Sequence, residues 1–307
     1  MTGAGLSLMR AEDFWLRVLP AGGLAQRVLA AAVMLPAALL LIWLGGWAYL
    51  AALGLAGVLM FWELYRLPWP AALAPAERNP RPVPSGRLPE RGALRREFAL
   101  VTLGLLAALL LAGLGEWLAA LLLMAAIALA AAGYALGTGR NPAWAMVRVT
   151  YVGLPCLSLA WLRGGFPATE GLPLPDGEVA TFFLLGIVWA ADTLAFAFGR
   201  SIGGPRLAPR VSPNKTWAGL GGAIVGGAAV GIGVALVLGL GPVLPALAGA
   251  VLAGIAQIGD LVASAVKRHY MVKDYSALIP GHGGLLDRVD GVIFAAPPGA
   301  LLLWLMG

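Results

Sequence analysis

Charged residues are scarce in this chain of 307 residues. Asp, Glu, Lys and Arg make up 12% of it, whereas hydrophobic residues make up 60%. A soluble domain carries about 25% charged residues, so a single core in water could not bury this much apolar surface. The lipid bilayer is the solvent that suits such a composition, which excludes an ordinary soluble enzyme.

Cysteine is almost absent as well. Cys156 is the one cysteine, and it lies in an apolar stretch. One cysteine cannot form an internal disulfide, and no Cys/His metal pattern is present. We interpret Cys156 as a small core residue. The segment Met1–Arg27 lacks the features of a secretory signal, so we expect it to stay on the mature protein.

The net charge of +6 has a plain explanation in a membrane protein. No basic block carries interleaved aromatic residues, so we expect no nucleic-acid partner. Positive charge in the loops instead sets the orientation of the spans.

Apolar runs of about 20 residues mark membrane-spanning helices. We count nine and therefore expect an all-α polytopic membrane protein. The expected spans are Val28–Leu44, Trp47–Tyr65, Phe98–Gly113, Trp117–Leu136, Val147–Leu162, Ala180–Phe198, Trp217–Leu240, Val243–Val266 and Val289–Met306.

Nine spans also place the positive charges consistently. With a cytoplasmic N-terminus, every Lys and Arg except Arg163 falls in a cytoplasmic segment, and the C-terminus lies on the far side. We expect an N-terminal region, residues 1–179, with about five spans and a basic, extended cytoplasmic loop at 67–97. Residues 180–307 would form a catalytic region of about four spans with its site at the cytoplasmic face.

Lysine and histidine are rare, and their positions point to a site. The lysines are Lys215, Lys267 and Lys273, against 18 arginines, and both histidines, His269 and His282, lie near two of the lysines. Since the chain uses Arg as its general cation, retained lysines suggest positions where a compact ammonium contacts phosphate.

The stretch from Gly259 to Gly291 holds most of these residues. Asp260, Ser264, Lys267 and Arg268 share one helix face by their spacing. Asp287 and Asp290, at i and i+3, face one point, and carboxylates that converge with phosphates are the usual Mg²⁺ ligands. A salt bridge of Asp260 to Lys267 or to another helix is the alternative. The glycine-rich turn 280–284 could leave N–H groups free for a phosphate, or merely connect two helices.

A second polar cluster precedes the seventh span. Asp192 lies inside an apolar run, either as a site residue or as a structural hydrogen-bond partner. Ser212 and Thr216 flank Lys215 and suit a phosphate, although they also suit a helix N-cap. Two further features look structural: the Gly-x-x-x-Gly pairs at 222–231, as close helix packing or a dimer contact, and Glu63, as an interfacial anchor beside Arg66.

These residues together resemble a known family. The segments Ser264–Arg268 (SAVKR), Lys273–Ser276 (KDYS) and Ile279–Asp290 (IPGHGGLLDRVD) are similar to the signature of the phosphatidate cytidylyltransferases, or CDP-diacylglycerol synthases. The region around Asp192 and the segment Ser212–Thr216 also resemble that family. The likeness is specific from about Trp189 to Gly291. Ala263, Ala218 and Phe196 depart from its pattern, which puts secondary contacts in question.

The resemblance implies a reaction and a set of roles. The phosphate of phosphatidic acid would attack the α-phosphorus of CTP, giving CDP-diacylglycerol and pyrophosphate in a bacterial inner membrane. Mg²⁺ would be the cofactor, with a second cation and a homodimer left open. The implied metal ligands are Asp260 and Asp287, supported by Asp192 and Asp290; the catalytic set is Lys267, Arg268, Lys273, His282 and Arg288; the substrate-binding set is Ser212, Asn214, Lys215, Thr216, Arg200, Ser264, Gly283 and Gly284.

Two other functions fit parts of the pattern. A CTP-dependent lipid-alcohol kinase would use similar phosphate chemistry but release CDP, and the full length of the signature argues against it. A secondary transporter would also carry intramembrane Asp residues and glycine-rich helices. Transporters usually show matching halves, whereas here the polar residues crowd the C-terminal third and no internal repeat is visible.

Overall fold

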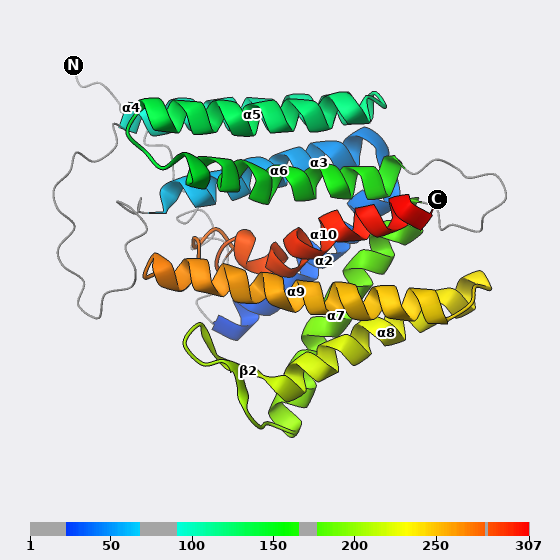
Figure 1. Cartoon of the computed structure of the whole chain (residues 1–307). Coiled ribbons are helices and arrows are strands. Elements are labelled where there is room, and N and C mark those ends of the chain that lie inside the picture. Colours follow the sequence, from blue (N-terminus) through cyan, green and yellow to red (C-terminus); the bar gives the residue numbers. More distant parts are fainter. Residues whose placement is uncertain (1–22, 68–90, 166–176, 280–281, 307) are drawn as a thin grey trace, which may run out of the picture.

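The computed structural model describes residues 23–67, 91–165, 177–279 and 282–306. Within these ranges the chain forms nine α-helices and one short β-hairpin (Figure 1). The elements are α2 (Gly23–Leu44), α3 (Gly46–Arg66), α4 (Arg91–Gly113), α5 (Trp117–Gly137), α6 (Pro142–Gly164), α7 (Gly177–Ser201), β1 (Arg206–Ala208), β2 (Ser212–Thr216), α8 (Trp217–Leu238), α9 (Val243–His269) and α10 (Leu286–Met306).

The helices confirm a polytopic, predominantly α-helical membrane protein. Eight of them, α3 to α10, are long and apolar enough to cross a bilayer. In α2, the described apolar part Ala32–Leu44 is shorter than that requirement. The antiparallel hairpin β1–β2 was not expected, since the sequence analysis predicted helices only. It is a connection between two spans and leaves the architecture helical.

The two shortest expected spans, Phe98–Gly113 and Val147–Leu162, are parts of longer helices. α4 begins at Arg91, seven residues before the apolar run, and α6 begins at Pro142. The expected extended loop 67–97 is therefore wrong for its last part, while residues 68–90 lie outside the described ranges. The helix includes Glu97, whose side chain is fully buried; its pairing with Arg140 and a 2.7 Å hydrogen bond from Tyr65 offset the cost of burying the carboxylate.

Glycines allow three C-terminal helices to pack backbone against backbone. A side chain at Gly222 or Gly226 of α8 would strike the carbonyls of Leu194 and Ala190 in α7. One at Gly227 would strike the carbonyl of Gly249 in α9. The two Gly-x-x-x-Gly pairs thus serve packing within the chain, and they hold the end of α7 and the start of α8 together.

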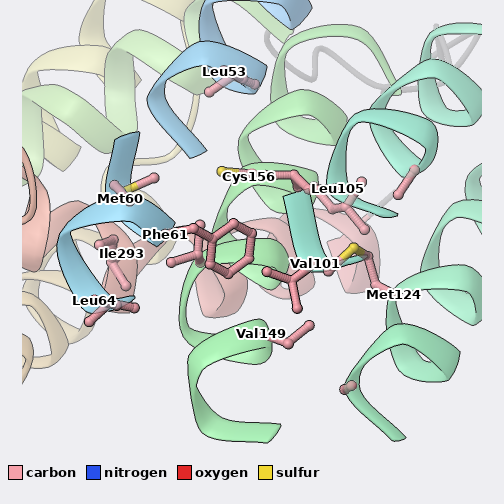
Figure 2. Close-up of a cluster of buried hydrophobic side chains, with 14 of the residues drawn as sticks. Leu53, Met60, Phe61, Leu64, Val101, Leu105, Met124, Val149, Cys156 and Ile293 are labelled. Carbon is pink, nitrogen blue, oxygen red and sulfur yellow. The ribbon is translucent and has the colours of Figure 1, made fainter. Parts of the chain in front are cut away.

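The core of the N-terminal half is a cluster of interlocking apolar side chains (Figure 2). Phe61 of α3 is fully buried and packs near Val149 of α6, and Cys156 is buried among the same residues. Ile293 of α10 belongs to this cluster, so the last helix packs against the first half of the chain. A second cluster joins α7, α8, α9 and α10 around Leu184. The boundary expected at residue 179 stays a prediction.

Arg163 marks the end of the molecule opposite the other described positive charges. Its guanidinium donates hydrogen bonds to the carbonyls of Ile42, at 2.6 Å, and Trp43, at 3.1 Å. These carbonyls end α2, where a helix presents partial negative charge. The one positive residue that departs from the loop-charge pattern therefore has a structural use.

Candidate functional site

One face of α9 carries the polar residues that the sequence grouped there. Ser264 donates a 3.4 Å hydrogen bond to the Asp260 carboxylate one turn earlier. Lys267 lies two turns beyond Asp260 and contacts Asp287 at the start of α10. Arg268 follows in the last turn and is exposed. The shared face of Asp260, Ser264 and Lys267 is confirmed.

The first cluster joins four residues from α7, β2 and α9. The Lys215 ammonium lies 2.6 Å from Oδ2 of Asp260 and 2.9 Å from Oε1 of Gln257. Gln257 in turn donates a 2.9 Å hydrogen bond to Asp192. Asp260 thus forms a salt bridge, but with Lys215 of β2 rather than with Lys267 or another helix, and Asp192 does act as a hydrogen-bond partner. Both carboxylates remain accessible, since Asp192 is exposed and the Asp260 side chain is 33% exposed.

This cluster lines a cleft of about 740 Å³. Such a volume lies in the range of small-molecule sites. The walls come from the end of α7, the hairpin, the start of α8 and the middle of α9; the polar lining residues are Asp192, Arg200, Arg206, Asn214, Lys215, Thr216, Gln257 and Asp260. Cationic and carboxylate side chains both line the cleft, which suits a ligand that brings both phosphate and a cation.

The hairpin brings the expected phosphate-binding segment to the cleft. Thr216 ends β2 and caps α8 by accepting a 3.1 Å hydrogen bond from the Gly219 amide, so its N-cap reading is confirmed. Arg206 of β1 donates to the Asn214 carbonyl at 3.2 Å. Ser212 begins β2 and does not line the cleft. A glycine at 199 leaves room for Thr216, whose hydroxyl would lie 3.1 Å from a Cβ there.

The second cluster is built around Asp287. Its carboxylate accepts hydrogen bonds from Lys267 at 2.7 Å and from the amides of Tyr275 and Gly284 at 2.9 Å each. The Asp287 side chain is 2% exposed, so its oxygens are committed to the protein in this arrangement. Burial, together with the nearby Tyr151 and Asp287, raises the pKa of Tyr275 above its usual range. Direct metal binding by Asp287 stays a prediction.

The glycine-rich turn differs from the expectation of free N–H groups. The Gly283 amide donates to the Ile279 carbonyl at 3.1 Å, and the Gly284 amide donates to Asp287. The next two amides, of Leu285 and Leu286, donate to Glu63. A buried helix start must satisfy its N–H groups, and here carboxylates do so. Phosphate contact by Gly283 and Gly284 stays a prediction; residues 280–281 lie outside the described ranges.

Asp290 lies three residues after Asp287 on α10, near enough to feel the charges of Asp260, Lys267 and Asp192. Among the described residues no three Asp, Glu, His or Cys side chains converge to hold a metal as they stand. In donor chemistry, though, carboxylates of this kind suit a divalent cation such as Mg²⁺.

Most of the remaining expected site residues belong to the chain segment around the second cluster, whereas Arg200 lies at the cleft of the first. His282 is partly buried, and its Nδ1 has no hydrogen-bond partner among the described residues. Lys273 and Arg288 are exposed, as is Arg268, and Arg200 stands at the rim of the cleft. The structure therefore brings Lys215 and Lys267 into carboxylate contacts, whereas Lys273 is left at the surface.

Two residues of this region were missed or misread in the sequence. Gln257 bridges Lys215 and Asp192, and its signal was available: it is one of two glutamines in the chain and lies three residues before Asp260. The prediction that Glu63 is an interfacial anchor is wrong, because its side chain is fully buried against the glycine-rich turn. No spacing rule links residues more than 200 positions apart, so sequence alone could not place it there.

Membrane spans that end at a cleft lined by the Lys215–Asp260 pair define a class: an integral membrane protein with a charged cleft at the ends of its helices. The profile of the cytidylyltransferase family matches residues 25–306, and the chain belongs to that family.

Several curated relatives are similar to this chain over about half of its length or somewhat less. A phosphatidate cytidylyltransferase of Brucella abortus is 46% identical over 169 residues, 53% of this chain and 57% of that protein. Proteins of the same name from Mycobacterium leprae and Bacillus subtilis are 42% and 40% identical, over 43% and 39% of this chain and 41% and 46% of theirs. The chain thus spans about half the length of the curated relatives that it matches.

Proposed function

We propose that this protein transfers the CMP group of CTP to phosphatidic acid, giving CDP-diacylglycerol and pyrophosphate, at the cytoplasmic face of a bacterial inner membrane. The observation that carries the proposal is the cleft in which Lys215 pairs with Asp260 and is linked through Gln257 to Asp192, in a chain of the cytidylyltransferase family. Relatives named phosphatidate cytidylyltransferase support the choice of substrates.

The reaction requires little proton transfer by the protein. The attacking phosphate of phosphatidic acid is already anionic, so catalysis consists of neutralising charge and aligning the two phosphates. Lys215 and Lys267 lie at opposite ends of the polar face of α9 and would contact phosphate oxygens. On substrate binding, Lys215 would exchange its Asp260 contact for a phosphate, with Gln257 holding the ammonium in place.

Asp260, Asp192 and Asp290 would hold Mg²⁺. When bound, the ion supplies positive charge beside the triphosphate and the leaving pyrophosphate. Because Lys215 takes Oδ2 of Asp260 in this arrangement, cation binding and the release of Lys215 toward a phosphate are expected to occur together. Asp287 then acts through Lys267 and the loop that it anchors.

The direct test is an assay of purified protein in mixed micelles. Given CTP, Mg²⁺ and phosphatidic acid, it should release pyrophosphate and form CDP-diacylglycerol, identified by mass spectrometry. Omission of the lipid or of the cation is expected to abolish both products. Release of CDP with a lipid alcohol as acceptor would instead identify a kinase. Absence of pyrophosphate under all these conditions would overturn the proposal.

A further inference from the structure

Glu63 connects the N-terminal half of the chain to the site. It lies near the end of α3, and its side chain is fully buried. Its Oε1 accepts hydrogen bonds from the Ser276 hydroxyl at 2.6 Å and the Leu285 amide at 2.7 Å. Its Oε2 accepts one from the Leu286 amide at 2.8 Å. All three partners are donors, as a carboxylate acceptor requires.

The two amides are orphan N–H groups at the start of α10. A helix normally satisfies them with a residue of its own chain segment just before the first turn. Here the acceptor comes from another helix, 222 and 223 positions away. The negative charge of Glu63 also lies at the positive end of the α10 dipole, which favours this location.

The Glu63 carboxylate also approaches Gly284 so closely that a side chain there would not fit. A Cβ at this position would lie 2.6 Å from Oε1 of Glu63 and 3.1 Å from Oδ2 of Asp287. Two carboxylates therefore approach the backbone where a side chain would otherwise project. The absence of a side chain at Gly284 is explained by Glu63, without reference to any ligand.

The site depends on the turn that Glu63 holds. Asp287 directly follows Leu286, and it fixes the Lys267 ammonium and the amides of Tyr275 and Gly284. We propose that Glu63 is the positioning residue of this site, which fixes the start of α10 and through it the places of Asp287 and Lys267. The effect on turnover rests on the proposed function, whereas the effect on the loop does not.

Glu63→Gln removes one acceptor with little change in size. If the amide oxygen takes the Oε1 position, the NH₂ group faces the Leu286 N–H; in the flipped orientation it faces the Leu285 N–H. One backbone donor loses its partner in either case. Hydrogen exchange of the 282–290 segment, measured by mass spectrometry, should become at least about tenfold faster, since roughly 1.4 kcal/mol is a factor of ten.

Glu97→Gln is the matched control. Glu97 is also a fully buried glutamate of the N-terminal half, but it contacts Tyr65, Arg140 and Arg148 instead of the start of α10. This change should lower the thermal midpoint and leave exchange of the 282–290 segment as in the wild type. Equally fast exchange of this segment in both glutamate variants would overturn the inference, because a general destabilisation of the protein would then explain the faster exchange.

A compensating pair tests the geometry. Gly284→Ala should lower kcat by on the order of 10²-fold, since a misplacement of about 1 Å has such an effect. Glu63→Asp withdraws the carboxylate by one methylene, so in that background Gly284→Ala should cost far less. Independent, additive losses would contradict the proposed contact. The expected signature is a fall in kcat with KM for CTP nearly unchanged, in protein that purifies normally.

The two proposals fail in different ways. If the wild type makes no CDP-diacylglycerol but Glu63→Gln still speeds hydrogen exchange of the 282–290 segment, the proposed function is wrong, while the role of Glu63 in holding that segment is supported. If the wild type is active and hydrogen exchange in Glu63→Gln equals that of the wild type, only the proposed role of Glu63 is wrong. Normal kcat in Glu63→Gln with faster exchange would show that Glu63 holds the loop without positioning the site.

Discussion

Lys215 and Asp260 form an ion pair of 2.6 Å between the end of β2 and the middle of α9. The pair is partly accessible, at 18% and 33% exposed, and it lies in the wall of the cleft. An exposed ion pair contributes little to stability, about 0–1 kcal/mol, so its geometry matters more for a ligand than for folding.

The first prediction concerns lysine-to-arginine changes. The Lys215 ammonium fits among Asp260 Oδ2, Gln257 Oε1 and the Gln257 carbonyl at 3.4 Å. A guanidinium is a wide planar fork and would displace these neighbours, so Lys215→Arg and Lys267→Arg should each lower kcat by on the order of 10²-fold. Turnover of purified variants at saturating CTP is the measurement.

Lys273 and Arg95 complete this series. Composition alone predicts that all three lysines resist replacement, yet Lys273 is exposed. Arg95→Lys, on the exposed side of α4, is the control for a generic cytoplasmic charge. Wild-type turnover in all three lysine variants would refute the assignment of these lysines to the site. A loss at Lys215 and Lys267 alone would follow the structure rather than the composition.

The second prediction concerns metal dependence. Asp260→Asn keeps the size of the side chain and removes the charge that balances both Lys215 and a cation. Activity should fall by more than about 10²-fold, and added Mg²⁺ should not restore it. Chelation of the wild type should have the same effect and be reversed by Mg²⁺. Near-normal turnover of Asp260→Asn at saturating Mg²⁺ would remove Asp260 from the metal set.

Much of the fold could be predicted because membrane spans leave a simple signal. Apolar runs located the helices, and α9 began at the expected residue, Val243. The helix boundaries were predicted wrongly where neighbouring helices bury a polar side chain, as with Glu97 in α4. Hydropathy counts such a residue as loop, although its ion pair with Arg140 satisfies it inside the protein.

The site was predictable where its residues are rare and close in sequence. Lys267 and Asp287 lie 20 positions apart in a recognisable stretch, and they meet as expected of a site. Glu63 is an ordinary residue beside Arg66, and its role depends on how α3 packs against the start of α10. The hairpin was missed because Ser212–Thr216 carries no alternation of apolar residues, and it forms only through pairing with Arg206–Ala208.

The third prediction concerns orientation. Cys156 is buried, so an introduced cysteine should dominate labelling by a membrane-impermeant maleimide. Leu114→Cys lies between α4 and α5, on the expected far side, and Ser201→Cys ends α7 on the expected cytoplasmic side; both positions are exposed. In intact spheroplasts only the first should react, and lysis should expose the second. The reverse pattern would invert the topology.

The fourth prediction tests the glycine packing that holds the cleft together. Gly227 of α8 faces the Gly249 carbonyl of α9 so closely that an added methyl group would overlap it. Gly227→Ala should therefore destabilise the protein by about 1–3 kcal/mol, the usual effect of overpacking. Because α8 follows directly from Lys215 and Thr216, the variant should also weaken CTP binding.

Gly233 provides the control on the same helix. A methyl group there meets nothing within 4 Å among the described atoms, so Gly233→Ala should leave stability unchanged or slightly improved, since alanine favours the helix. Thermal midpoints in detergent, followed by size-exclusion chromatography, compare the two variants at equal added volume. Equal midpoints would show that α8 and α9 do not pack through Gly227. A fall for Gly227→Ala alone, accompanied by a raised KM for CTP, would show that this contact supports the cleft as well as the fold.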